Sequence, residues 1–174
     1  MAGDLEAFTE LARLSIDKLY AVARLILRDT ERAEDATQEA LVAAWRDVAG
    51  LRDPDRFESW MRRLVVHACY HEARKDRRRQ RYEGQVRPLD EGTRDPAIAL
   101  ADRDELERGF TRLEPEQRAL IVLHYHLGLP LAETALAMSL PVGTVKSRLH
   151  RTTQQMRAAL EADARLPLSE GRLT

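Results

Sequence analysis

The segment 131–156 constrains the fold most, because it has the pattern of two helices separated by a tight turn. Leu131, Ala135 and Met138 share one face of the first helix, and residues 139–141 interrupt the pattern where a turn is required. Pro141 then begins a second helix, since proline lacks the N–H group that a first helical turn leaves unpaired. The apolar positions of this second helix recur at helical spacing and are expected to face the core: Val145, Leu149, Met156 and Leu160. The segment therefore predicts a helix-turn-helix.

The outward face of the second helix carries hydrogen-bond donors and cations. Its members are Thr144, Lys146, Ser147, Arg148, His150 and Arg151. A helix with such groups near its N-terminal half fits the major groove of DNA, where they contact base edges and phosphates. A solvent-exposed basic face on a packed helix is the alternative that this pattern alone leaves open.

Residues 29–48 predict a helix with an acidic face. Asp29 and Thr30 are typical capping residues, and acids follow in the first turn, where a helix favours them. The predicted core stripe consists of Ala36, Ala40, Leu41, Ala44, Trp45 and Val48. The remaining polar group consists of Glu34, Asp35, Gln38 and Glu39. Carboxylates cannot hold phosphates, so this face requires a protein partner or simply faces solvent.

A third helix is predicted after Asp53 and Pro54, a cap followed by a first-turn proline. Its core face consists of Phe57, Trp60, Met61, Leu64, Val65 and Ala68. The opposite stripe consists of Arg63, His67, Tyr70, Arg74, Arg77, Arg78, Arg79 and Arg81. Single-stranded DNA needs cations for its backbone and flat rings for its unstacked bases, so this stripe is a candidate single-strand site.

These segments resemble the extracytoplasmic-function (ECF) sigma factors of bacterial RNA polymerase. Residues 141–151 are similar to the helix that reads the promoter -35 element, and residues 113–118 resemble the pattern that precedes it. Residues 33–39 resemble the signature that docks on the clamp helices of the largest polymerase subunit. Residues 57–64 resemble the segment that captures and melts the -10 element.

The resemblance implies a role for each polar group. It implies core-polymerase binding by Glu34, Asp35, Gln38 and Glu39. It implies -10 binding by Arg63, His67, Tyr70, His71, Arg74, Arg77 and Arg78, although the family commonly places Asn and Asp where this chain has His67 and His71. It implies -35 binding by Thr144, Lys146, Ser147, Arg148, His150 and Arg151. The implied partners are core RNA polymerase, through its clamp helices and flap region, promoter DNA and an anti-sigma factor. We expect no enzymatic activity, no cofactor and no metal.

The expected fold is all-α, with two small helical domains joined by a flexible linker, the second containing the helix-turn-helix. We expect a first domain at 1–80, a linker at 81–102, a second domain at 103–165 and a tail at 166–174. The 174 residues carry a net charge of -1, but the charge is unevenly distributed. Residues 61–88 hold nine Lys and Arg against three acids, and residues 118–160 hold five against one. Two basic blocks predict two DNA-contacting surfaces.

Two other classes of protein, a metal-binding protein and a stand-alone transcriptional regulator, would each account for one feature of this sequence. His67 and His71 have the i, i+4 spacing of metal ligands, but Cys69 points about 200° away from His67 on a helix, so the three cannot converge. A stand-alone regulator could bind operators as a dimer through the helix-turn-helix, but it would leave the acidic face and the basic stripe unused. One cysteine, no signal peptide and no membrane-length apolar run predict a cytoplasmic protein without membrane insertion.

Overall fold

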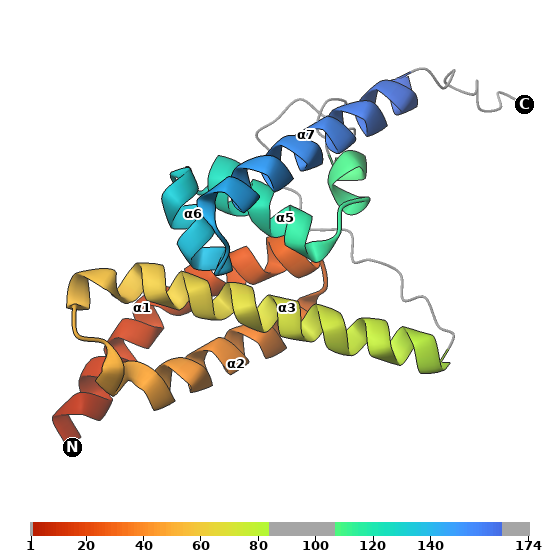
Figure 1. Cartoon of the computed structure of the whole chain (residues 1–174). Coiled ribbons are helices and arrows are strands. Elements are labelled where there is room, and N and C mark those ends of the chain that lie inside the picture. Colours follow the sequence, from red (N-terminus) through yellow and green to blue (C-terminus); the bar gives the residue numbers. More distant parts are fainter. Residues whose placement is uncertain (1, 84–106, 165–174) are drawn as a thin grey trace, which may run out of the picture.

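A computed structural model describes residues 2–83 and 107–164, and the regular elements in these ranges are helical (Figure 1). The first block, residues 2–83, contains α1 (Ala2–Leu27), α2 (Thr30–Asp47), η1 (Val48–Gly50), η2 (Pro54–Arg56) and α3 (Phe57–Glu83). The second block, residues 107–164, contains a helical stretch at 107–111, α5 (Pro115–Ile121), the π-helix η3 (Val122–His126), α6 (Leu131–Met138) and α7 (Val142–Ala164). The predicted all-α class is confirmed. Helix α3 continues through residues 81–83, whereas the rest of the expected linker and the tail 166–174 lie outside the described residues.

The helix starts of the first block follow from local capping. The Asp29 carboxylate accepts a hydrogen bond from the backbone N–H of Arg32 (3.0 Å), which satisfies an amide that the first turn of α2 leaves unpaired. Asp53 accepts in the same way from the N–H of Asp55 (3.1 Å) and starts η2, which leads directly into α3. Both starts agree with the sequence-based prediction.

Helix α2 packs through small side chains, which lets α1 and α3 approach it closely. Its buried positions are Ala33, Ala36, Thr37, Ala40 and Ala44. The prediction that Trp45 is a core residue was wrong: its side chain is 45% exposed and rests against the edge of Phe8, with ring centroids 5.2 Å apart. The alanine row leaves no room for an indole, so the ring lies at the margin of the helix pair.

The helix-turn-helix of the second block forms as predicted. Ser139 adopts a left-handed conformation (φ 53°) that ends α6, and the N–H of Leu140 then bonds to the carbonyl of Ala135 (3.0 Å). In α7, Val145 and Leu149 are buried. Further along, Met156 and Leu160 are half-buried, and their side chains lie next to Gly109 of the helical stretch 107–111.

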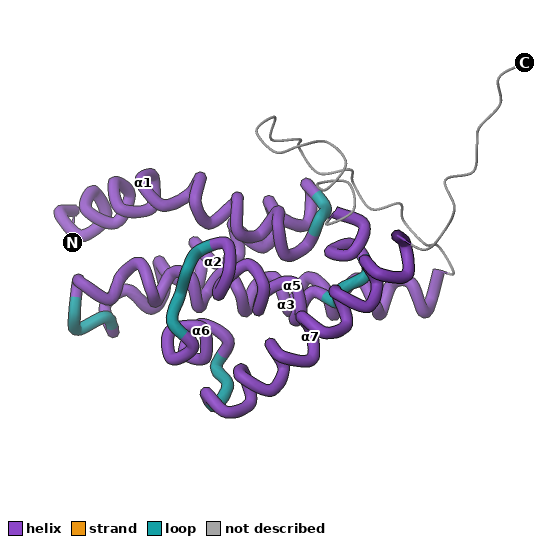
Figure 2. Tube along the Cα trace, turned by 90° about the horizontal axis from the view of Figure 1, so that it is seen from above, coloured by secondary structure: helices purple, strands orange, loops and turns teal. Residues whose placement is uncertain are grey.

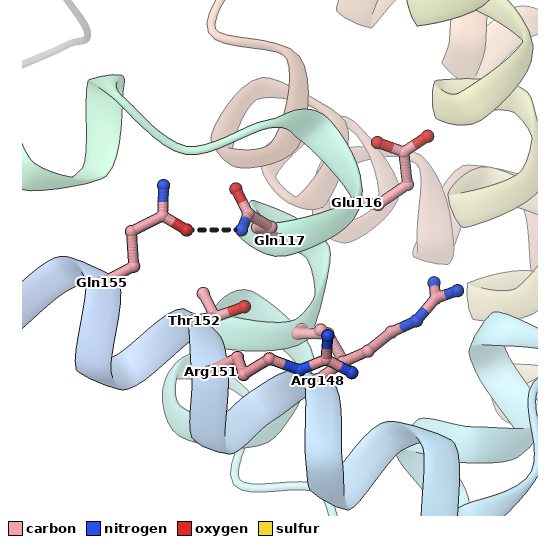
Figure 3. A pocket seen from close by; sticks show the side chains of 7 residues that line it. Glu116, Gln117, Arg148, Arg151, Thr152 and Gln155 are labelled. Atoms are coloured by element: carbon pink, nitrogen blue, oxygen red, sulfur yellow. Dashed lines mark hydrogen bonds between the residues drawn. The ribbon is translucent and has the colours of Figure 1, made fainter.

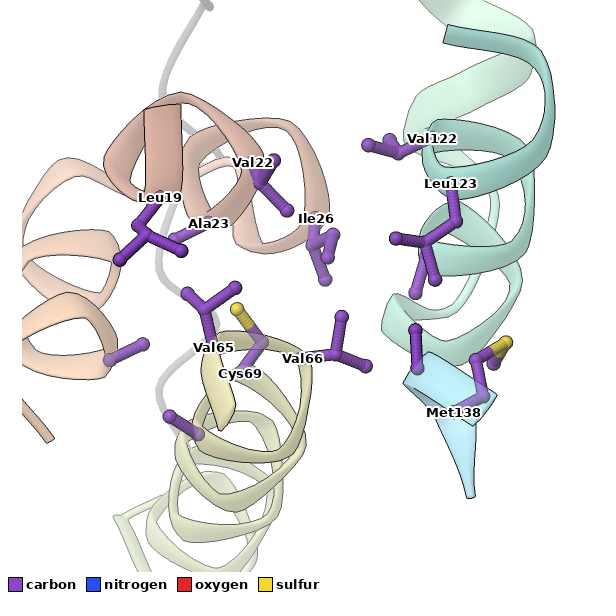
Figure 4. Packing of buried hydrophobic residues seen from close by; sticks show 14 of the residues in the cluster. Leu19, Val22, Ala23, Ile26, Val65, Val66, Cys69, Val122, Leu123 and Met138 are labelled. Carbon is purple, nitrogen blue, oxygen red and sulfur yellow. The ribbon is translucent and has the colours of Figure 1, made fainter. Parts of the chain in front are cut away.

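The two blocks pack against each other and share one core. In Figure 1, α2 and α6 lie on opposite sides of α3, and in Figure 2 α1 and α6 do so. Helix α1 also contacts α5 directly. In Figure 4, Ile26 and Val66 of the first block face Leu123 and Met138 of the second. This second packed side explains why Val66 is fully buried although it lies outside the predicted core face of α3.

A buried arginine reinforces this packing. Arg118 of α5 donates from Nε to the carbonyl of Ile26 (2.5 Å), near the end of α1, and from Nη1 to the carbonyl of Leu113 (2.7 Å). Burial lowers the pKa of Arg118 to about 10, with the nearby Arg28 charge acting in the same direction. Arg118 thus ties a helix end of the first block to the second block. Separately, none of the helices in the described ranges is long and apolar enough to cross a membrane.

Candidate nucleic-acid and polymerase interfaces

The acidic face of α2 separates into an outward part and an inward part. Glu34, Asp35 and Gln38 are exposed. Glu39 instead turns toward α3, where its Oε1 lies 2.7 Å from His71 Nδ1 and its Oε2 lies 3.7 Å from Lys75 Nζ. The structure therefore brings together Glu39 and His71, two residues that sequence analysis assigned to different surfaces.

Two apolar residues extend the outward face of α2. Val42 is 48% exposed and Trp45 is 45% exposed. They lie seven and ten residues after Asp35, which places them on the same side of the helix. Exposed apolar side chains next to an acidic patch are typical of a protein-binding surface. Sequence analysis missed them because it placed Trp45 in the core; the i+3, i+7 and i+10 spacing from Asp35 was the available signal.

The cationic stripe of α3 is only partly accessible. Arg63, Arg74, Arg77 and Arg78 are exposed, and the side chains of Arg79 and Arg81 lie outside the described residues. Tyr70 is largely enclosed, and its hydroxyl is buried with no hydrogen-bond partner among the described residues. Burial raises the pKa of Tyr70, as does the charge of Glu116, while Arg148 opposes the shift. The ring proposed for stacking is thus covered in this arrangement.

His67 contacts the second block. Its Nε2 lies 3.0 Å from Oγ of Ser139, in the turn of the helix-turn-helix. Burial lowers the pKa of His67, and the charge of Arg63 lowers it further. Desolvation is the larger of these two causes.

The histidines and the cysteine of α3 do not converge. His67 bonds Ser139, His71 bonds Glu39, and Cys69 is fully buried in the core. In residues 2–83 and 107–164, no three His, Cys, Asp or Glu side chains gather as ligands for a metal ion.

The outward face of α7 is well exposed. Lys146, Ser147, Arg148, His150 and Arg151 are exposed, and Thr144 is half-buried. A hollow of about 400 Å³ lies between α5 and α7 (Figure 3). Its lining comprises Glu116, Gln117, Leu120, Arg148, Arg151, Thr152 and Gln155. Across it, Gln117 donates to the side-chain oxygen of Gln155 (2.8 Å), which holds the two helices at a set spacing.

Comparison with known proteins gives two family matches. Residues 11–79 match Sigma-70 region 2, and residues 103–156 match Sigma-70, region 4. The chain is 34% identical to the ECF RNA polymerase sigma factor SigM of Mycobacterium tuberculosis over 163 residues. This match covers 90% of this chain and 78% of SigM. It is 26% identical over 170 residues to the ECF RNA polymerase sigma factor SigW of Bacillus subtilis, which covers 91% of each protein.

Two solved structures have a fold similar to that of this chain. CnrH in complex with the cytosolic domain of CnrY is 26% identical, with a TM-score of 0.62 over 93% of this chain and 92% of that one. The sigma factor RpoE in complex with the anti-sigma factor NepR from Bartonella quintana shares the fold, with a TM-score of 0.73, 22% identity and coverage of 91% and 99%. The present chain therefore belongs to the ECF sigma factors, which bind core RNA polymerase and direct it to initiate transcription at promoters.

Proposed function

We propose that this sigma factor uses three separate surfaces, one for polymerase and two for promoter DNA. The outward face of α2, formed by Glu34, Asp35 and Gln38, docks on the clamp helices of the largest polymerase subunit. The exposed carboxylates beside Val42 and Trp45 are the observation that carries this assignment, since the combination suits a protein partner and repels DNA. Glu39 acts from behind this face by positioning His71 and Lys75 of α3.

The cationic stripe of α3 is the proposed site for the unpaired -10 strand. Arg63, Arg74, Arg77 and Arg78 suit the phosphate backbone, and Tyr70, His67 and His71 suit the bases. The outward face of α7 is the proposed reader of the duplex -35 element, because its exposed donors lie on the first turns of a helix that follows a tight turn. RNA synthesis itself belongs to the polymerase.

Two further partners are proposed. The second block is expected to contact the flap region of polymerase, so that the two blocks are held at two places on the enzyme. RpoE, which shares the fold, is in complex with the anti-sigma factor NepR, and CnrH, a similar protein, is in complex with the cytosolic domain of CnrY. By analogy we propose an anti-sigma factor for the present chain, and action in the cytoplasm.

Charge reversal on α2 tests the polymerase assignment. We expect Asp35→Lys to weaken binding to core polymerase by about 100-fold, because it places like charges opposite each other in an interface. Asp17→Lys, which makes the same change at an exposed position of α1, is the matched control and is expected to bind normally. Affinity is measured with labelled sigma factor titrated with core enzyme, and circular dichroism checks helicity. Equal affinities for Asp35→Lys and wild type would remove α2 as the docking face.

A further inference from the structure

The hollow between α5 and α7 is lined on one side by a single face of α7. Four of its lining residues follow one another at i, i+3, i+4 and i+7, so they share this face: Arg148, Arg151, Thr152 and Gln155. Residues of α5 form the facing wall, and Figure 3 shows both sets of side chains. The volume of about 400 Å³ falls within the range of about 300–1,000 Å³ that is usual for small-molecule sites. The hollow is therefore large enough for a ligand.

Thr152 provides a buried hydroxyl at this hollow. The residue is only 1% exposed, and its hydroxyl forms no hydrogen bond with any residue that the structure describes. Its neighbours on α7 differ, because Ser147 and Thr153 each donate to a backbone carbonyl three residues earlier (3.0 and 2.8 Å). A buried hydroxyl without a partner costs free energy. Since Thr152 lines the hollow, a molecule bound there is the available partner.

The charges around the hollow favour an anion. Arg148 and Arg151 both line it, and neither forms an ion pair with a residue of the described ranges. Glu116 is the acid of the lining, and its Oε2 lies 3.6 Å from Nη2 of Arg77 on α3. A cation outside the hollow therefore already offsets the charge of this carboxylate. The two guanidinium groups of α7 are left to donate charge-assisted hydrogen bonds to a bound anion.

Gln117 supplies an amide whose orientation is fixed. Its Oε1 accepts from the backbone N–H of Glu114 (2.9 Å), and its Nε2 donates to Oε1 of Gln155 (2.8 Å). An amide nitrogen carries two hydrogens, so Nε2 of Gln117 keeps one for a ligand. The groups that the hollow offers to a ligand are thus mainly hydrogen-bond donors, which complement a phosphate group.

We propose that the hollow between α5 and α7 binds a phosphate group. A phosphate has more acceptor oxygens than a carboxylate, so it can accept from two guanidinium groups and a hydroxyl at once. Two sources provide such a group: the backbone of promoter DNA beside the -35 element, and a free phosphorylated molecule the size of a nucleotide. The site itself does not depend on the role proposed for α7 in reading the -35 element.

Removing the hydroxyl of Thr152 tests the site. Inorganic phosphate is titrated into the full chain at constant ionic strength, and nuclear magnetic resonance follows the Nε–H signals of Arg148 and Arg151. We expect a saturable change in the wild type and binding about tenfold weaker in Thr152→Val, which loses one hydrogen bond to a charged ligand. Thr153→Val is the matched control and is expected to bind like the wild type, because the Thr153 hydroxyl already donates to His150. No saturable change in the wild type would overturn the site.

Two further measurements distinguish a phosphate site from a general attraction of anions and from a role in folding. Sodium acetate at the same ionic strength is expected to change the signals less than phosphate, and an equal response would overturn the preference for phosphate. Without phosphate, Thr152→Val is expected to be at least as stable to urea as the wild type, because a methyl group replaces a hydroxyl that has no partner. A clear loss of stability would show that the hydroxyl serves the fold rather than a ligand.

Binding of duplex -35 DNA distinguishes the two sources. If the DNA backbone supplies the phosphate, Thr152→Val is expected to bind every duplex sequence about tenfold more weakly than the wild type. If a free molecule supplies it, both chains bind duplex DNA alike, and adenosine diphosphate binds the wild type more tightly than inorganic phosphate does. Equal affinity of Thr152→Val and the wild type for inorganic phosphate would exclude both sources and overturn the site.

Discussion

Helices α3 and α7 are both long, both cationic on one side and both assigned to DNA, yet their cations are in different states. In the part of the chain that the structure describes, Arg62, Lys75 and Arg77 of α3 pair with carboxylates. Lys146 and Arg151 of α7 are exposed, and neither forms an ion pair with any residue that the structure describes. The reading face of α7 is therefore ready for duplex DNA, whereas the stripe of α3 is engaged by its own chain at Arg77 and exposed at its other described arginines.

The difference follows from how each helix is packed. Helix α7 buries one face, at Val145 and Leu149, and leaves the other free. Helix α3 is covered on two sides, so Val65 and Val66, which are neighbours in sequence, are both fully buried. A helix that is packed on two sides retains only a narrow polar stripe, and the accessibility of that stripe depends on the position of the covering block.

The largest effect is expected on the stability of the fold, at Arg118, which joins the two blocks. We expect Arg118→Met to lower the free energy of unfolding by about 3 kcal/mol, because the buried carbonyls of Ile26 and Leu113 lose their donors. Urea unfolding followed by circular dichroism measures the change. Arg157→Met, at an exposed position of α7, is the control and is expected to change stability by less than about 0.5 kcal/mol. Equal stability for both variants would show that the joint at Arg118 adds nothing to the fold.

An intermediate effect is expected on DNA binding by α7, whose outward face is already exposed. We expect Arg151→Ala to cost about 1–3 kcal/mol at one base position of the -35 element, since a guanidinium can bind a guanine edge through two hydrogen bonds. Lys146→Ala is expected to weaken binding to all DNA sequences alike, because an ammonium group contacts phosphate without reading a base. Selection from a randomised -35 library by holoenzyme measures both. An unchanged base preference in Arg151→Ala would show that another residue reads the element.

The smallest effect is expected from acid pH acting on His67. Its pKa is lowered in the folded chain, so below about pH 6.5 the unfolded chain binds the proton first and stability falls as the pH drops. The stabilising contribution of the neutral His67 ring is fully present above about pH 6.5. It amounts to a fraction of a kcal/mol, because the exposed ring is screened by solvent. The measurement is the difference in unfolding free energy between wild type and His67→Gln at about pH 7.5 and about pH 5.5. A difference that does not vary with pH would contradict the lowered pKa.

Local chemistry made much of this molecule predictable. The caps at Asp29 and Asp53, the prolines at 115 and 141 and the turn at Ser139 all act on residues within one helical turn, so the sequence around them predicts where helices begin and end. The exposed faces of α2 and α7 follow from helical periodicity in the same way. The all-α class and the helix-turn-helix are therefore consequences of short-range sequence patterns.

The contacts that escaped prediction are between segments distant in sequence. Periodicity shows that Val66 and Tyr70 lie on given faces of α3, but not that the second block covers them. It shows that Glu39 and His71 are polar, but not that they meet across 32 residues. Trp45 was misplaced for a related reason, since the close approach of α1 and α3 to an alanine row excludes a large ring.

The length of α7 has a consequence for its packing. Its 23 residues form one unbroken helix, about 34 Å long, with the groove-facing donors near one end and Met156 and Leu160 near the other. A methyl group added at Gly109 would lie 3.1 Å from Cδ2 of Leu160, so the Leu160 side chain would have to shift by a few tenths of an ångström. The far end of α7 therefore rests against the stretch 107–111 at a place where Gly109 has no side chain. The packing of the helix that carries the reading residues thus depends in part on a glycine that lies outside the helix-turn-helix.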